Sequence, residues 1–279
     1  MWRDDIVLLD GAVGTSLWEK AADRVAVWRY NIENPAIVKE LAAEYLDAGS
    51  RIILANTFGA NRYAVGKTDY SVQEIVSTGV RLARETIGDR AKVALAVGPL
   101  PLLMEPYGDL TEEDAYAAFD EQISAGAAEK PDVIVLQTFM GADMMHVAAE
   151  AAAKHNLPIF SMLTFTEVGK TIMGHSVERF VDTMKDIPLA GIGINCSLGP
   201  DKAVPVIASF RKYTDLPLVF KPNAGKPILQ DGEEKVQYDV DTFVEDILPA
   251  LDFDVKYIGG CCGSNASYVR ALRKRIFGE

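Results

Sequence analysis

Three cysteines are the residues of this chain whose type and spacing are best suited to chemistry. Cys196 ends the segment Gly-Ile-Asn-Cys at 193–196, and Cys261 and Cys262 stand in Gly-Gly-Cys-Cys-Gly at 259–263; no other cysteine occurs in the 279 residues. Thiolates suit zinc, and three protein ligands with an open fourth position are the pattern of a catalytic site rather than a structural one. The sequence therefore predicts a zinc centre held by Cys196, Cys261 and Cys262.

The adjacent pair of cysteines requires an irregular backbone. Consecutive residues of a strand point to opposite faces, so Cys261 and Cys262 cannot both reach one metal from within a strand. Glycines stand before and after the pair and allow the unusual backbone angles that are needed. Three other interpretations stay open: buried free cysteines that pack as small apolar side chains, a vicinal disulfide that leaves Cys196 unexplained, and a structural zinc site, for which neither stretch offers a histidine.

The elements that must position these cysteines follow an alternating pattern of short apolar runs and longer amphipathic stretches. Such alternation is typical of a (β/α)₈ barrel, with a doubly wound open sheet as the alternative. We expect residues 1–279 to form one such α/β barrel domain. The candidate strands are residues 6–10, 51–57, 92–97, 132–137, 159–165, 191–196, 218–221 and 255–259. The candidate helices include residues 35–48, 71–86, 112–128, 142–154, 176–185, 202–212 and 240–251.

A barrel places its chemistry at the carboxyl ends of its strands. Polar residues and glycines do collect at those ends, and strands six and eight flank strand seven, so Cys196 and the cysteine pair are expected to converge. Asn223, at the end of strand seven, would lie between them. We expect its side-chain oxygen, or a water, to fill the fourth position of the metal when no substrate is bound.

The composition excludes several classes of partner. A net charge of −12 argues against binding to nucleic acid or to an anionic membrane surface. The first residues lack the basic start and apolar core of a signal peptide, and no apolar run reaches the length of a membrane span. An odd number of cysteines, none placed as a staple, fits the reducing cytoplasm.

Five motifs in this chain resemble those of the homocysteine S-methyltransferase family. This family includes the homocysteine-binding module of cobalamin-dependent methionine synthase, betaine–homocysteine methyltransferase and the S-methylmethionine-dependent enzymes. The resemblance covers almost the whole chain and implies a zinc barrel in which the substrate thiol takes the fourth place on the metal. The motifs are Asp-Gly-Ala-Val-Gly-Thr at 10–15, Asn-Thr-Phe at 56–58, Gly-Ile-Asn-Cys at 193–196, Pro-Asn-Ala-Gly at 222–225 and Gly-Gly-Cys-Cys-Gly at 259–263.

This resemblance implies an enzyme that transfers a methyl group to homocysteine to give methionine. A free thiol has a pKa of about 8.5, and its thiolate is the nucleophile. Binding to zinc would deprotonate the thiol near neutral pH, so that it can attack an activated methyl group. Zinc would thus generate and position the nucleophile.

Further residues are candidates for holding the rest of the substrate. Asp10 ends the first strand, where its carboxylate could pair with the substrate amino group. Backbone N–H groups at Gly11 and Ala12 could receive the substrate carboxylate. Asn56 and Asn195 are expected to fix the loops around the site.

Gln137 departs from the family pattern, because the family usually has a glutamate at the end of strand four. A neutral amide accepts a hydrogen bond from an ammonium group but contributes no charge. Either the enzyme holds homocysteine with Asp10 alone, or its thiol substrate differs; homocysteine is the preferred expectation.

The methyl donor is less visible in the sequence. The opening motif looks more like the cobalamin-linked branch, and the chain leaves no room for a corrinoid module after its eighth helix. We therefore expect a methylcorrinoid, carried on a separate protein, as the donor. S-methylmethionine or S-adenosylmethionine is the alternative, and a thiol-binding or zinc-carrying protein without catalysis is the alternative from another class. His175 and the loop of residues 105–109 receive no assigned role.

Overall fold

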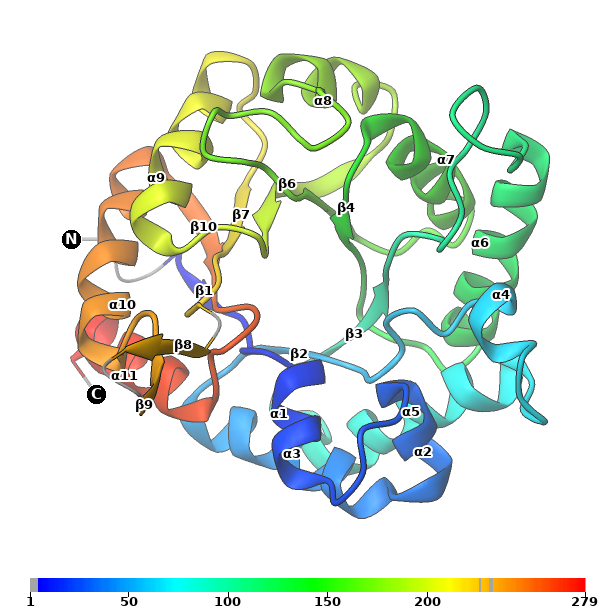
Figure 1. Cartoon of the computed structure of the whole chain (residues 1–279), viewed down its shortest axis with the longest axis horizontal. Helices are drawn as coiled ribbons and strands as arrows, with labels where there is room; N and C mark the ends of the chain where they lie inside the picture. The colour runs from blue at the N-terminus through cyan, green and yellow to red at the C-terminus, as the bar shows by residue number, and fades with distance from the viewer. Residues whose placement is uncertain (1–4, 226, 231–232, 279) are drawn as a thin grey trace.

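Eight parallel strands curve into a barrel, and helices surround it (Figure 1). The computed structural model describes residues 5–225, 227–230 and 233–278. The barrel strands are β1 (Val7–Leu8), β2 (Ile52–Leu54), β3 (Lys92–Val97), β4 (Val133–Phe139), β5 (Ile159–Leu163), β6 (Leu189–Asn195), β7 (Leu218–Lys221) and β10 (Val255–Ile258). Their order is β1-β10-β7-β6-β5-β4-β3-β2, and a parallel bridge between Leu9 and Ile52 joins the last strand to the first. The predicted (β/α)₈ barrel is confirmed.

The strands are short and apolar because both of their faces are covered. In β3, for example, every residue after Lys92 is buried. Side chains that point into the barrel form a small cluster of their own, separate from the larger apolar layer between strands and helices. This inner cluster contains Leu9, Ile52, Ala94, Val133, Val135, Phe160, Met162 and Val219.

The predicted helices are present, with ends that differ by a few residues. Pro35 begins α3, as expected for a proline at a first helical position, and Thr111 caps α6 through a hydrogen bond to the Asp114 N–H. The α-helices are α1 (Gly14–Lys20), α2 (Tyr30–Glu33), α3 (Pro35–Ala48), α4 (Arg62–Val65), α5 (Val72–Ile87), α6 (Glu112–Ala127), α7 (Ala142–Ala153), α8 (Val177–Thr183), α9 (Pro200–Ser209), α10 (Val240–Ile247) and α11 (Ala266–Phe277). The 3₁₀ turns are η1 (Val27–Arg29), η2 (Phe210–Lys212) and η3 (Leu248–Phe253).

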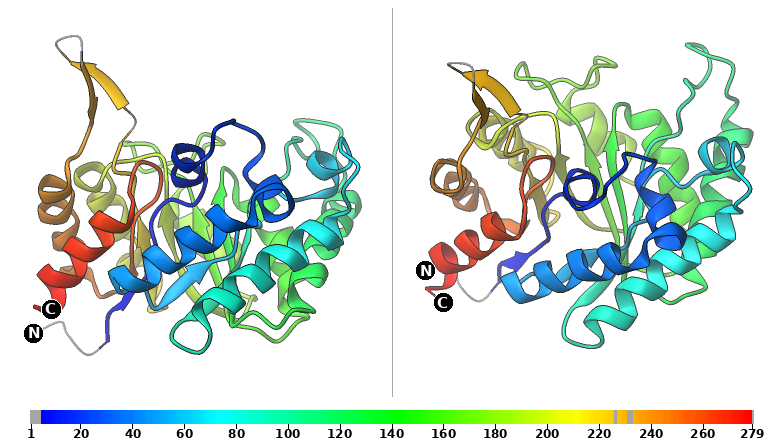
Figure 2. Two further views of the ribbon diagram at one scale, coloured as in Figure 1. Left: turned by 90° about the horizontal axis from the view of Figure 1, so that it is seen from below. Right: turned by 60° about the horizontal axis from the view of Figure 1, so that its bottom comes forward.

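One hairpin is added to the barrel. Strands β8 (Pro227–Gln230) and β9 (Glu233–Val236) pair antiparallel after β7, and Figure 2 shows them extending beyond the ends of the barrel strands. Among the helices that the structure describes, none has the length and apolar character needed to cross a bilayer.

Candidate metal centre

The barrel brings the three cysteines together from distant parts of the chain. Cys196 follows β6, Cys261 and Cys262 follow β10, and β7 lies between these two strands. The three Sγ atoms all lie within 4.8 Å of one another, and the Sγ atoms of Cys196 and Cys262 are 3.7 Å apart. Sulfurs on a tetrahedral zinc, at about 2.3 Å from the metal, lie about 3.8 Å from each other. The donor set and its spacing therefore fit zinc.

Backbone irregularity at both stretches turns the thiols toward each other. β10 ends at Ile258, so the adjacent cysteines stand outside the strand, as their spacing predicted. Gly263 has a φ of +82°, and a Cβ atom there would lie 2.3 Å from a backbone oxygen. Cys196 and Ser197 both have left-handed backbones, with φ of 59° and 63°. Such conformations are costly for residues other than glycine and often mark functional sites.

The end of strand β7 and Pro222, the residue after it, hold both stretches by backbone hydrogen bonds. The Cys196 N–H donates to the Lys221 carbonyl at 3.0 Å, and the Cys261 N–H donates to the Pro222 carbonyl at 2.8 Å. The positions of the cysteines are thus set by the end of one strand that carries no cysteine itself.

The three thiols are coupled electrostatically. Hydrogen bonds from the Cys261 and Cys262 side chains lower the pKa of Cys196 to about 3. The same interaction with Cys196 raises the pKa of Cys261 well above its ordinary value and raises that of Cys262 to about 11. Cys196 is therefore the most acidic of the three thiols.

Asn223 lies beside the cluster. Its side chain is 7% exposed, and its hydrogen bond to Cys196 helps to lower the pKa of that thiol. Among the described residues, no group hydrogen-bonds the buried Oδ1 atom of Asn223. An unpartnered buried oxygen next to three sulfurs fits the predicted fourth ligand, and this role stays a prediction.

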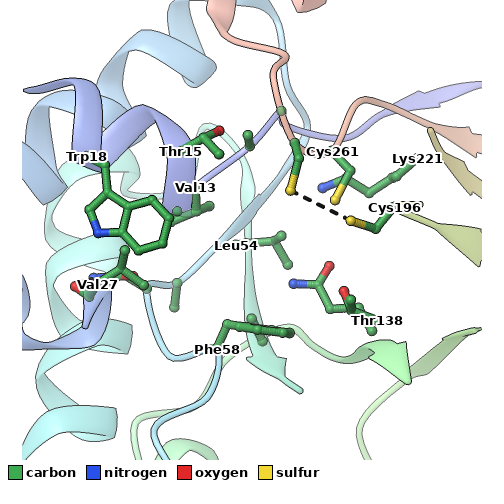
Figure 3. Close-up of a pocket in the computed structure, with 18 residues that line it drawn as sticks. Val13, Thr15, Trp18, Val27, Leu54, Phe58, Thr138, Cys196, Lys221 and Cys261 are labelled. Carbon is green, nitrogen blue, oxygen red and sulfur yellow. Dashed lines mark hydrogen bonds between the residues drawn. The ribbon is translucent and has the colours of Figure 1, made fainter. Parts of the chain in front are cut away.

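A cavity of about 230 Å³ opens beside the cysteines (Figure 3). Most of the residues around it are apolar, and Trp18 and Phe58 contribute aromatic rings (Figure 3). Of the predicted substrate-binding residues, Gly11, Ala12, Asn56 and Gln137 line the cavity.

Comparison with known proteins decides the family of this chain. The family model described as homocysteine S-methyltransferase matches residues 7–276. The chain belongs to the homocysteine S-methyltransferase family. The resemblance predicted from the five motifs is confirmed.

The individual relatives of this homocysteine S-methyltransferase family member share only a low sequence identity with it. The methionine synthase of Mycobacterium tuberculosis is 25% identical over an alignment of 300 residues, which covers 97% of this chain but 24% of that protein. The chain thus spans about a quarter of the length of this relative. The metallated form of the homocysteine methyltransferase MmuM from Escherichia coli is 20% identical, with a TM-score of 0.82 over 98% of this chain and 96% of that one. Its apo form gives 21% identity and a TM-score of 0.77, with the same coverage.

In this family member, Asp10 lies behind the cavity wall instead of in it. The side chain is fully buried; its Oδ1 accepts from Lys221 Nζ at 2.5 Å, and its Oδ2 accepts from the Leu54 N–H at 2.7 Å. Both carboxylate oxygens therefore have partners within the protein. The predicted contact of Asp10 with a substrate amino group stays untested.

Two predicted asparagines hold the walls of the site. Asn195 accepts from the Thr138 N–H at 2.7 Å, donates to Thr138 Oγ1 at 2.8 Å, and donates to Cys261 Sγ at 3.7 Å. It thereby ties β4 to the metal cluster. Asn56 donates to the Val27 carbonyl at 2.7 Å. Asn56 and Val27 both line the cavity.

The first loop is also held in place. The Ala12 N–H donates to the Ser264 carbonyl at 3.1 Å, and the Tyr45 hydroxyl donates to the Ala12 carbonyl at 2.7 Å. The Ala12 N–H proposed for a substrate carboxylate therefore already has a partner. Gly11 lines the cavity next to it.

Several residues at the site were not predicted from the sequence. Lys221 is 2% exposed at the end of an apolar strand, and that unusual position was a signal for a buried ion pair. Trp18 lies on α1, a helix of seven residues that is too short to show a clear period. Thr138 has a φ of 65°, which the sequence does not reveal.

A second cavity, of about 180 Å³, lies where loops follow β3, β4 and β5. Glu105 and Tyr107 line it, so the loop of residues 105–109 shapes the barrel mouth. His175 lines it too, and its Nδ1 accepts from the Ala142 N–H at 2.9 Å, at the start of α7. Burial lowers the pKa of His175, which fits a neutral ring that accepts this bond.

Proposed function

We propose that this protein transfers a methyl group to a thiol, with homocysteine as the acceptor and methionine as the product. The observation that carries the proposal is the cluster of three Sγ atoms within 4.8 Å at the wall of a 230 Å³ cavity. Membership of the homocysteine S-methyltransferase family supports the reaction class. The names of the methionine synthase and of MmuM support homocysteine as the acceptor.

Zinc is the metal that these ligands suit best. Cys196, Cys261 and Cys262 would hold it, and the Asn223 Oδ1 would fill the fourth place until the acceptor arrives. When bound, the metal lowers the pKa of the acceptor thiol, so that the sulfur is a nucleophile at neutral pH.

The chain's own residues position the reacting sulfur and keep water away from it. The Asn195 amide donates to Cys261 Sγ at 3.7 Å and fixes the orientation of that ligand. Apolar side chains, including Val13 and Leu54, make up most of the cavity wall and limit the access of water. Holding the sulfur in place for an incoming methyl group removes much of the entropic cost of the reaction.

The donor that we propose is a methylcorrinoid on a separate protein. A corrin ring is too large for a cavity of 230 Å³, so its methyl group would have to be presented from the barrel mouth. The mouth carries exposed apolar side chains on loops that follow β3, β4 and β5, and such surfaces mark interaction sites. We call these residues the mouth patch; they are Leu102, Leu103, Tyr107, Met140, Val168 and Ile172.

A sulfonium donor such as S-methylmethionine is the second candidate. It is supported by Trp18 and Phe58, which line the cavity. A methyl sulfonium is a cation, and aromatic rings attract cations through their faces. A small donor of this kind would enter the cavity itself.

The decisive experiment combines metal content with turnover. Purified, reduced protein is expected to bind one zinc ion and to methylate homocysteine, either with methylcob(III)alamin, whose absorbance then changes, or with S-methylmethionine. Cys196→Ser removes the ligand that is already ionised, so zinc and turnover should both be lost. Ser209→Ala on α9 serves as the control and should retain both.

Two results would contradict the proposal. One is wild-type protein without stoichiometric zinc. The other is undiminished methyl transfer by Cys196→Ser. Activity with S-methylmethionine and none with the corrinoid would select the second donor.

A further inference from the structure

The ion pair between Lys221 and Asp10 is the one buried charge pair next to the metal centre in the described part of the chain. Lys221 is 2% exposed and Asp10 is fully buried, with 2.5 Å between Nζ and Oδ1. The second oxygen of Asp10 accepts from the Leu54 N–H at 2.7 Å. The carboxylate that the sequence offers to a substrate ammonium group is thus already bonded to an ammonium group of the protein.

The cavity wall offers no replacement for that carboxylate. Among the described residues that line the cavity there is no aspartate or glutamate, and Lys221 is the one cationic side chain. Gln137 lies on the wall, 8% exposed, where the family pattern usually has a glutamate. The wall therefore has a positive charge and neutral amides, but no negative charge other than that of the thiolates.

A substrate ammonium group cannot easily take the place of Lys221. If a substrate ammonium group bound Asp10 in place of Lys221, the buried ammonium group of Lys221 would lose its partner, and an uncompensated buried charge is strongly destabilising. A lysine ammonium has three donors, and one of them is used on Asp10. The remaining donors can serve an anionic group of the substrate instead.

We infer that this barrel recognises its acceptor by the thiol and an anionic group, and not by an ammonium group. The acceptor class is then that of mercapto acids, with or without an amino group. Lys221 would bind the anionic group, and the lack of a negative charge at position 137 would leave a substrate ammonium group without an ionic partner. The inference rests on the proposed function, because it concerns the same thiol site.

Binding of two thiols to the zinc-loaded protein, without any methyl donor, tests the inference. Homocysteine and 4-mercaptobutyrate differ only in the amino group, and titration calorimetry gives a dissociation constant for each. The expected ratio of the two constants is within about threefold, because no charge-assisted hydrogen bond to the ammonium is made. Tenfold or tighter binding of homocysteine would overturn the inference and leave the proposed function intact.

Failure of both thiols to bind is a separate outcome. It would remove the thiol site on which the proposed function depends, and the inference would fall with it. The titration thus separates a wrong assignment of substrate class from a wrong assignment of function.

Two variants at position 137 test whether the missing negative charge there explains the lack of a contact with the substrate ammonium group. Gln137→Glu adds a carboxylate to the cavity wall. Homocysteine should then bind at least about tenfold more tightly than 4-mercaptobutyrate, because its ammonium group can form a charge-assisted hydrogen bond with this carboxylate. Gln137→Met is the matched control without charge and should keep the ratio near that of the wild type. An unchanged ratio in Gln137→Glu would contradict the placement of the amino group.

Lys221→Met tests the inferred contact between Lys221 and the anionic group of the substrate. It should weaken binding of 4-mercaptobutyrate about tenfold or more, because the cation on the wall is lost. Zinc content and circular dichroism show whether this variant is folded, and the Gln137 pair decides the inference if it is not. Undiminished binding of 4-mercaptobutyrate by folded Lys221→Met would exclude Lys221 as the anion-binding group.

Discussion

At the scale of single residues, the three thiols share their protons unequally. The pKa of Cys196 is lowered to about 3, mainly by the hydrogen bond with Cys261. The pKa of Cys262 is raised to about 11. The pKa of Cys261 is raised as well. Near neutral pH, a metal-free cluster therefore carries one negative charge, and a metal must displace the protons of the other two thiols.

This unequal sharing predicts how many protons the three thiols release when zinc binds. Zinc should release about two protons per ion at pH 7, one each from Cys261 and Cys262, because Cys196 is already ionised. Lowering the pH by one unit should then weaken zinc binding about a hundredfold. Calorimetric titration in buffers of different ionisation enthalpy measures the count, and a value near three would contradict the charge assigned to Cys196.

The residues of the site were predictable to different degrees. The cysteine cluster could be predicted from the sequence because no cysteine occurs elsewhere and glycines flank the pair. The partner of Asp10 could not, since Lys221 is 211 positions away and only the folded barrel brings the two together. A carboxylate at a strand end looks the same in sequence whether it faces a substrate or a lysine.

At the scale of elements, β6 and β7 pack unusually closely next to the cluster. Gly193 of β6 pairs with Val219 of β7, and a Cβ atom on Gly193 would lie 1.8 Å from the Val219 carbonyl oxygen. No side-chain rotation relieves a clash with backbone, so the strands would have to move apart. Cys196 lies three residues further along the chain, directly after β6, and would move with it.

Gly193→Ala should therefore be destabilising. We expect a loss of roughly 1–3 kcal/mol in the free energy of unfolding, together with weaker zinc binding, because overpacking forces the backbone to shift. Urea denaturation of the metal-free protein measures the first, and zinc titration the second.

Gly14→Ala is the matched control for this substitution. The nearest atom to a Cβ on Gly14 is a methyl carbon of Val27 at 3.9 Å, so the change should leave the stability equal or slightly higher. Equal stability of the Gly193→Ala and Gly14→Ala proteins would show that the close approach of the two strands is not required.

Elements differ in how well the sequence predicts them. The helices α3 and α5 have 14 and 16 residues and appear in the sequence as long amphipathic stretches. The helices α2 and α4 have four residues each, which is about one turn and too short for a period to be seen. Strand β4 runs two residues beyond its predicted end at Gln137, through the left-handed Thr138.

At the scale of the whole molecule, the two ends of the barrel differ, because the mouth patch lies at the end where loops follow β3, β4 and β5. Tyr107, in the loop after β3, is 70% exposed within this patch. Tyr213, which precedes β7 at the opposite end, is 43% exposed. These two tyrosines make a matched pair for a test of docking.

Tyr107→Glu should lower transfer from a protein-borne methylcorrinoid about tenfold, because a charge in the centre of an apolar contact must lose its water. Free methylcob(III)alamin, which brings no protein surface, should be used at an unchanged rate. Steady-state kcat/KM with each donor measures the difference. Tyr213→Glu should leave both rates unchanged, and an equal loss in the two variants would contradict docking at the mouth.

The barrel was predictable because eight apolar runs alternate with helical stretches along the chain. The hairpin of β8 and β9 was not predicted, since Pro227 starts a stretch that reads as a loop after Asn223. The sequence did not reveal how sparse the closing junction of the barrel is, because β1 has only two residues and the bridge to β2 is made by Leu9, just after it.

That sparse junction makes one backbone amide a reporter of the buried charge pair. The Leu54 N–H donates across the junction to Asp10 instead of to another backbone carbonyl. Deuterium from the solvent should replace this proton slowly while Lys221 holds Asp10 in place. In Lys221→Met the exchange should be faster, and it can be followed by mass spectrometry in the absence of any metal, thiol or methyl donor.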